Sequence, residues 1–124
     1  MNMKLVILES PYGSEDPEVV KENVRYARAC MHDCLVVHGE APYASHLLYT
    51  QPGVLNDRQS DDRRLGIEAG LAWGEEAEAT VVYTDRGLSP GMEEGIARAA
   101  KAGREVEFRK LPNWLEMSRR NNGP

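Results

Sequence analysis

Residues 81–94 contain the feature that most constrains the fold, because an apolar run there passes through a polar turn straight into a helix start. The run Val81 to Tyr83 has the apolar, β-branched character of a buried strand. Ser89 is suited to cap the following helix, and Pro90 to its first position, where a missing N–H costs nothing. The N–H groups of the first helical turn would face an anion placed over the carboxyl end of the strand, and Arg86 would add a cation. The junction therefore predicts an anion site.

Short apolar runs and helical patterns alternate along the rest of the chain. The KLVIL run at residues 4–8 suits a buried parallel strand, and a long amphipathic helix begins at Asp16 and ends near Gly39. Further strands are predicted at 44–49, 80–83 and 105–109, and further helices at 63–73, 90–102 and, as a short segment, 112–120. This order predicts an α/β fold, an open parallel sheet of four to five strands with helices on both faces. We expect a single domain over residues 4–120 and a disordered tail at 121–124.

Composition narrows the range of partners. The 124 residues carry a net charge of −5, which gives no electrostatic footprint for nucleic acid. No apolar run approaches the roughly 20 residues of a membrane span. The segment before the first predicted loop is too short for a signal peptide. We therefore expect a cytoplasmic protein without membrane association. Cys30 and Cys34 lie four apart on the long helix and are predicted to be buried, reduced thiols. The alternative, a metal or redox site, needs two more ligands, and His32 and His38 do not share their helical face. We therefore expect neither a metal nor a cofactor.

Three predicted loops meet where a parallel sheet binds its ligands, over the carboxyl ends of the strands. They cover residues 10–14, 50–62 and 85–89. They supply hydroxyls for a phosphate, carboxylates for sugar hydroxyls or a base edge, and an aromatic ring for stacking. This combination fits a nucleotide better than a metal. The candidate ligand-binding residues, which include one histidine from the second strand, are Ser10, Tyr12, Gly13, His46, Asp85, Arg86, Gly87, Ser89 and Gly91.

Several candidates also have simpler interpretations. Asp85 can merely begin a turn, Arg86 can be solvated, and Ser89 can cap its helix without touching a ligand. A lone strand histidine such as His46 is most often a packing residue. The sequence has no Walker-type loop, no His-Glu-x-x-His motif and no Ser/His/Asp order, so the corresponding reaction classes are excluded.

The segments KLVILESPYG and TDRGLSPGMEEGIARAAKAGREVEFR, with the polar loop between them, resemble the nucleoside 2-deoxyribosyltransferases and the related deoxynucleoside 5′-monophosphate N-glycosidases. Small proteins of phage and bacterial genomes share this plan. The resemblance covers roughly residues 4–109. It implies a flavodoxin-like sheet, with Tyr12 near the sugar or base and an aspartate from the middle of the chain holding the sugar or assisting the leaving base. It also implies a homodimer or higher homo-oligomer, because sites in that family are commonly completed across a dimer interface.

The same resemblance places the nucleophile on the helix after the third strand. That nucleophile is a glutamate six residues after the phosphate-binding serine, and six residues after Ser89 lies Gly95. Glycine cannot attack a sugar. Either Glu94 or Glu93 has taken the role through a shift of the helix start, or covalent chemistry has been lost. In the first case Asp57, Asp61 or Asp62 would assist departure of the base.

Three hypotheses follow. The leading one is a protein that binds a nucleotide or nucleoside without covalent catalysis, for example a phage-type protein that sequesters a nucleotide signal. The second is an N-glycosidase or 2-deoxyribosyltransferase with Glu94 or Glu93 as nucleophile and Asp57 or Asp61 assisting. The third is a protein-interaction domain on the same scaffold, because a fold alone does not fix function.

Overall fold

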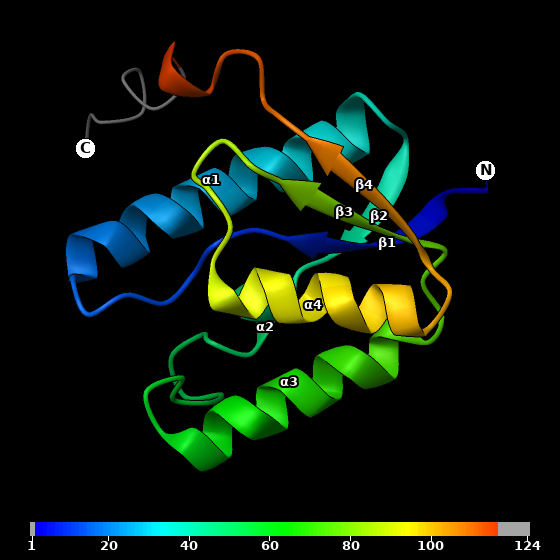
Figure 1. The fold of residues 1–124 in the computed structure, drawn as a ribbon. Helices are drawn as coiled ribbons and strands as arrows, with labels where there is room; N and C mark the ends of the chain where they lie inside the picture. Colours follow the sequence, from blue (N-terminus) through cyan, green and yellow to red (C-terminus); the bar gives the residue numbers. More distant parts are fainter. Residues whose placement is uncertain (1, 117–124) are drawn as a thin grey trace.

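The structure, a computed structural model, describes residues 2–116, which form a four-stranded sheet flanked by helices (Figure 1). Parallel strands alternate with helices, as the apolar periodicity predicts. The elements in chain order are β1 (Lys4–Glu9), α1 (Pro17–Val36), β2 (Glu40–Tyr43), α2 (Ser45–Leu48), α3 (Ser60–Gly74), β3 (Ala79–Tyr83), α4 (Pro90–Lys101) and β4 (Glu105–Arg109).

All strands of the sheet are parallel, in the order β2-β1-β3-β4. Val6 of β1 pairs with Ala79 of β3, and Ala79 pairs with Glu105 of β4. The chain therefore moves to one side of β1 through α1 and to the other side through the later helices. The predicted flavodoxin-like α/β fold is confirmed, and the strand order reverses between β1 and β3, where such folds place their ligand.

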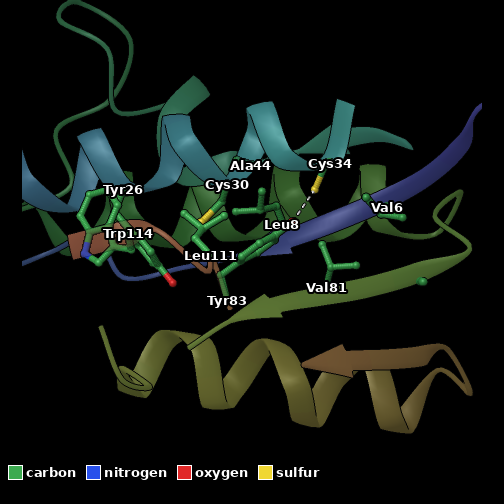
Figure 2. Close-up of a cluster of buried hydrophobic side chains, with 11 residues drawn as sticks. Val6, Leu8, Tyr26, Cys30, Cys34, Ala44, Val81, Tyr83, Leu111 and Trp114 are labelled. Atoms are coloured by element: carbon green, nitrogen blue, oxygen red, sulfur yellow. Dashed lines mark hydrogen bonds between the residues drawn. The ribbon is translucent and has the colours of Figure 1, made fainter. Parts of the chain in front are cut away.

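The core lies between the sheet and α1, and Figure 2 shows its side chains. β3 is buried along its whole length, which explains its uninterrupted apolar sequence. Tyr26, Cys30 and Cys34 of α1 pack on this face, and both cysteines are free and buried, as predicted. On the opposite face α4 is anchored by Met92, which is 1% exposed. None of the helices in the part of the chain that the structure describes combines the length and apolar character needed to cross a membrane.

The predicted strand at residues 44–49 is wrong. β2 ends at Tyr43, and residues 45–48 form the short helix α2, in which the N–H of Tyr49 donates to the carbonyl of Ser45. The sequence pattern does not indicate a strand at residues 40–43, because proline, here Pro42, is usually unfavourable within a strand. Proline is tolerated here because β2 lies at the edge of the sheet, where one side of the strand needs no N–H donors.

Two further boundaries differ from the predictions. β1 extends one residue beyond the predicted run 4–8, because Glu9 still pairs with Val82. α3 begins at Ser60, so the end of the predicted polar loop is already helical. Of the predicted helix at 112–120, residues 114–116 are helical. The rest of that helix and the predicted tail at 121–124 lie outside the described residues.

A buried ion pair connects the two edge strands beneath α1. The guanidinium of Arg109, at the end of β4, donates to both carboxylate oxygens of Glu40, at the start of β2, over 2.8 and 2.7 Å. The two side chains are 9% and 8% exposed. Arg109 also donates to the Tyr83 hydroxyl at 3.3 Å, and this hydroxyl donates to Asp33 of α1 at 2.7 Å. The hydrogen bonds from Arg109 hold the pKa of Glu40 below its ordinary value.

Replacing Glu40 should therefore destabilise the fold strongly. Glu40→Gln removes the buried counterion of Arg109 and leaves only its contact with the half-exposed carboxylate of Glu107, and the expected loss in free energy of unfolding is about 3 kcal/mol. Because the folded pKa of Glu40 is depressed, the stabilisation is present above its unfolded pKa and is lost as pH falls through the folded value. Urea unfolding at several pH values measures both effects.

The matched control is Lys21→Ala, which removes the exposed ion pair between Lys21 and Glu18 on α1. We expect this variant to change the free energy of unfolding by less than about 0.5 kcal/mol. Equal effects of the two substitutions would contradict a structural role for the Arg109–Glu40 pair.

Candidate functional site

An open cleft of about 1470 Å³ lies over the carboxyl end of β1, between α3 and the start of α4. It lies at the reversal of strand order, the place predicted from the alternation of strands and helices. The predicted polar segment 50–62 forms much of its rim. The lining residues that carry chemistry include Glu9, Ser10, Tyr12, His46, Asp57 and Ser89.

The first turn of α4 opens into this cleft. Ser89 caps the helix, since its hydroxyl accepts a hydrogen bond from the N–H of Met92 at 3.2 Å, and Pro90 follows at the first helical position. The capping role predicted for Ser89 is thus confirmed. Ser89, Pro90 and Gly91 also line the cleft, so the positive end of the helix dipole faces it. Contact between these residues and a ligand remains a prediction.

Asp85 and Arg86 occupy a different place from the one expected. The Asp85 carboxylate accepts hydrogen bonds from the Tyr26 hydroxyl at 2.6 Å and from the N–H of Leu111 at 2.9 Å, so it joins the last segment to α1. The Arg86 guanidinium donates to Asn23 of α1 at 2.9 Å. Neither residue, nor Gly87, lines the cleft.

Arg86 is nevertheless connected to a loop that lines the cleft, through Asn23. The buried side chain of Asn23 accepts from Arg86 and donates to the backbone carbonyl of Tyr12 at 2.9 Å. This chain of hydrogen bonds connects the loop after β3 to the loop after β1. Arg86 therefore positions the first loop, in which Tyr12 and Gly13 line the cleft.

Ser10 and His46 form a polar pair in the cleft. The Ser10 hydroxyl and His46 Nε2 are 2.8 Å apart, and the His46 ring lies edge-on to Tyr12 with 6.4 Å between ring centroids. His46 belongs to α2, although the sequence pattern predicts a strand at this position. Burial lowers the pKa of His46 to about 4, so the ring is neutral near pH 7.

Glu9 is the cleft residue that the sequence did not single out. Its carboxylate fills the space beside Gly95 of α4, where a Cβ on residue 95 would lie 2.2 Å from Glu9 Oε2. Burial raises the pKa of Glu9 to about 7, with Arg104 opposing the rise and Glu94 adding to it. A carboxylate closing an otherwise apolar strand, in line with a glycine on the facing helix, is the sequence signal that could have identified it.

The four carboxylates predicted to be catalytic are divided between the cleft and the surface. Glu94 lines the cleft and forms an exposed ion pair with Arg98 at 2.7 Å. Asp57 lines it opposite the first loop, where a Cβ on Gly13 would lie 3.7 Å from its carboxylate. Glu93 and Asp61 are exposed and do not line the cleft.

Metal ligands do not gather at this site. Across residues 2–116, no group of three or more His, Cys, Asp or Glu side chains is arranged to hold a metal ion. The polar groups of the cleft are instead hydroxyls, carboxylates and a helix N-terminus. This set suits an organic ligand with hydrogen-bonding groups and an anionic end.

A comparison of the sequence with protein families matches the domain of unknown function DUF7768 over residues 4–109. The chain belongs to this family. Among solved structures, the DUF7768 domain is similar to a 2-deoxyribosyltransferase from the psychrotolerant bacterium Bacillus psychrosaccharolyticus, a biocatalyst for nucleoside synthesis. The TM-score is 0.59 at 14% identity, covering 97% of this chain and 92% of that chain, which establishes a shared fold. No curated protein matches the sequence.

The depressed pKa of His46 gives a test of the cleft geometry. A histidine whose folded pKa lies below its unfolded value of about 6.5 stabilises the fold fully above that value and loses this contribution as pH falls toward the folded pKa. The stability difference between wild type and His46→Asn, measured by urea unfolding, should therefore shrink between pH 7 and pH 4.5. His32→Asn, at an exposed position of α1, is the matched surface control. A difference that stays constant over this range would show that His46 is not buried as described.

Proposed function

We propose that the DUF7768 domain binds a nucleoside or nucleotide in the cleft over the carboxyl end of β1. The observation that carries the proposal is the N-terminus of α4, which opens into the cleft at the reversal of strand order. The N–H groups of Met92 and Glu93 are taken up by Ser89, so the Gly91 N–H, the Ser89 hydroxyl and the positive end of the helix dipole are what suit a phosphate here. The solved 2-deoxyribosyltransferase of the same fold adds support, because its name describes action on a deoxyribosyl group.

The remaining cleft residues suit the sugar and the base. Tyr12 offers an aromatic face, and Ser10 and His46 offer neutral hydrogen-bonding groups beside it. Asp57 lies across from the first loop, within the polar segment, and suits a sugar hydroxyl or a base amine. A ligand with its phosphate at Ser89 would thus lay its sugar over the end of β1.

The setting of the protein follows from other features. Free, buried Cys30 and Cys34 are typical of a reducing compartment, which supports a cytoplasmic location. Segment 50–62 forms much of the rim of this open cleft. A second copy of the chain that covers this rim would complete the site, and we include a homo-oligomer in the proposal on that ground.

Substitution of Ser89 tests phosphate binding without removing the helix cap. Ser89→Asp keeps a good N-cap but places a carboxylate where the phosphate would bind. For whichever 2′-deoxynucleoside 5′-monophosphate the wild type binds, calorimetry should show an affinity loss of at least tenfold, about 1.4 kcal/mol. The affinity for the matching unphosphorylated nucleoside should change much less.

Ser89→Thr is the matched control, because it retains both the cap and the hydroxyl. Equal losses for nucleoside and monophosphate in Ser89→Asp would refute the phosphate position. If no nucleoside, mononucleotide or cyclic nucleotide binds or raises the melting temperature, the proposed function fails, and a protein-interaction domain on this scaffold becomes the better interpretation.

A further inference from the structure

The Glu9 carboxylate and the missing side chain of Gly95 occupy the same space. A Cβ built on Gly95 would lie 2.2 Å from Glu9 Oε2, 2.6 Å from Glu9 Cδ and 3.0 Å from Oε1. Real Cβ atoms do not approach other atoms so closely. Glycine at position 95 is therefore what lets the carboxylate of β1 stand against the first turns of α4.

The surroundings of Glu9 are those of a functional carboxylate. Glu9 lines the cleft, next to Ser10, whose hydroxyl pairs with neutral His46. The charged groups that act on it are Arg104, which precedes β4, and Glu94 of α4. Arg104 donates to the carbonyl of Gly74 at 2.8 Å, so its guanidinium is fixed near the carboxylate. Carboxylates with such perturbed environments in clefts are concentrated at reactive sites.

Glu94 is a weaker candidate than Glu9 for a reactive carboxylate in the cleft. Its carboxylate is exposed and pairs with Arg98 one turn along the helix, so it is solvated and engaged by a cation. Glu9 comes from the rigid end of a paired strand, and its position is fixed by the sheet. A nucleophile held by a strand in a partly dry site is better oriented than one on a surface helix.

We propose that Glu9 is the nucleophile with which the DUF7768 domain cleaves the N-glycosidic bond of a bound nucleoside or nucleotide. The proposal rests on the proposed function, because it needs the sugar to lie over the end of β1. A carboxylate oxygen of Glu9 bonds to C1′ of the sugar as the bond from C1′ to the base nitrogen breaks. The base leaves with the electron pair and takes a proton from water.

Hydrolysis then completes the cycle. The hydroxide left from that water attacks C1′ of the sugar ester, the bond from C1′ to Glu9 breaks, and the carboxylate is regenerated. The overall reaction consumes one water and yields the free base and the sugar or sugar phosphate. Burial raises the pKa of Glu9 to about 7, so the reactive ionised form grows as pH rises through neutrality.

The test measures binding and turnover on the same samples. Purified protein is incubated with the four 2′-deoxynucleoside 5′-monophosphates and with their nucleosides, and free base is followed by chromatography. Glu9→Gln should bind with an affinity within a few-fold of wild type but release base more than about 100-fold more slowly. Glu76→Gln, at an exposed position after α3 and outside the cleft, is the control and should match wild type.

A transplant distinguishes chemistry from simple structural damage. Glu9→Ala/Gly95→Ala removes both the carboxylate and the crowding, and should fold and bind without turnover. Glu9→Ala/Gly95→Glu returns a carboxylate to the same space from α4, and should recover part of the activity. With a 2′-fluoroarabinosyl nucleoside, which slows ester hydrolysis, the added sugar mass should appear on the wild-type peptide that contains Glu9.

Each outcome has a separate meaning. Binding and intact recovery of every probe by the wild type would overturn the catalytic role of Glu9 and leave the proposed binding function standing. Base release that Glu9→Gln does not slow, or a sugar adduct on Glu94, would also overturn it. The absence of binding to any probe would instead defeat the proposed function.

Discussion

The buried contact between Arg109 and Glu40 is the constraint on which the rest of this structure depends. It joins the two edge strands, and through Tyr83 it reaches Asp33 of α1. Two charges removed from water are tolerated only when their hydrogen bonds are satisfied together, so this network favours one arrangement of sheet and helix. Beyond β4 the chain is held again where Asp85 accepts from Leu111. The contacts of Asp85 with Tyr26 and Leu111 thus fix the loop after β3 on the α1 side of the sheet. The start of α4, which follows this loop, lines the cleft.

Part of the loop after β3 contacts α1 and part begins α4, and only the second part was predicted correctly from the sequence. The apolar run, the cap at Ser89 and the proline after it are local features, and each has the predicted structure. The residue types of Asp85 and Arg86 do not reveal whether their side chains contact a ligand or another part of the protein. Their contacts with Tyr26 and Asn23 join residues far apart in the chain, and local patterns carry no record of such pairings. The error at β2 had a different cause, because Pro42 is acceptable only once the strand is known to be an edge.

The site was predictable in position but not in its chemistry. The reversal of strand order and the loops near it follow from the alternation of strands and helices, and the cleft lies there. Glu9 could not be recognised in the same way, since its significance depends on Gly95 across the cleft. The likeness to a solved 2-deoxyribosyltransferase fixes the fold and leaves the reacting groups to the residues of this chain. Within the proposal, the carboxylate reaches the sugar from a strand and not from a helix.

The steric exclusion between Glu9 and Gly95 has an evolutionary consequence. Because a side chain on residue 95 would occupy the volume of the Glu9 carboxylate, a substitution at position 95 requires that carboxylate to move or to be absent, so the two positions are coupled. Substitutions at these two positions should therefore be correlated among relatives of this chain. A functional assignment that inspects only position 95 would find no carboxylate on this part of α4, whereas the two positions taken together show that β1 supplies a carboxylate to the same volume.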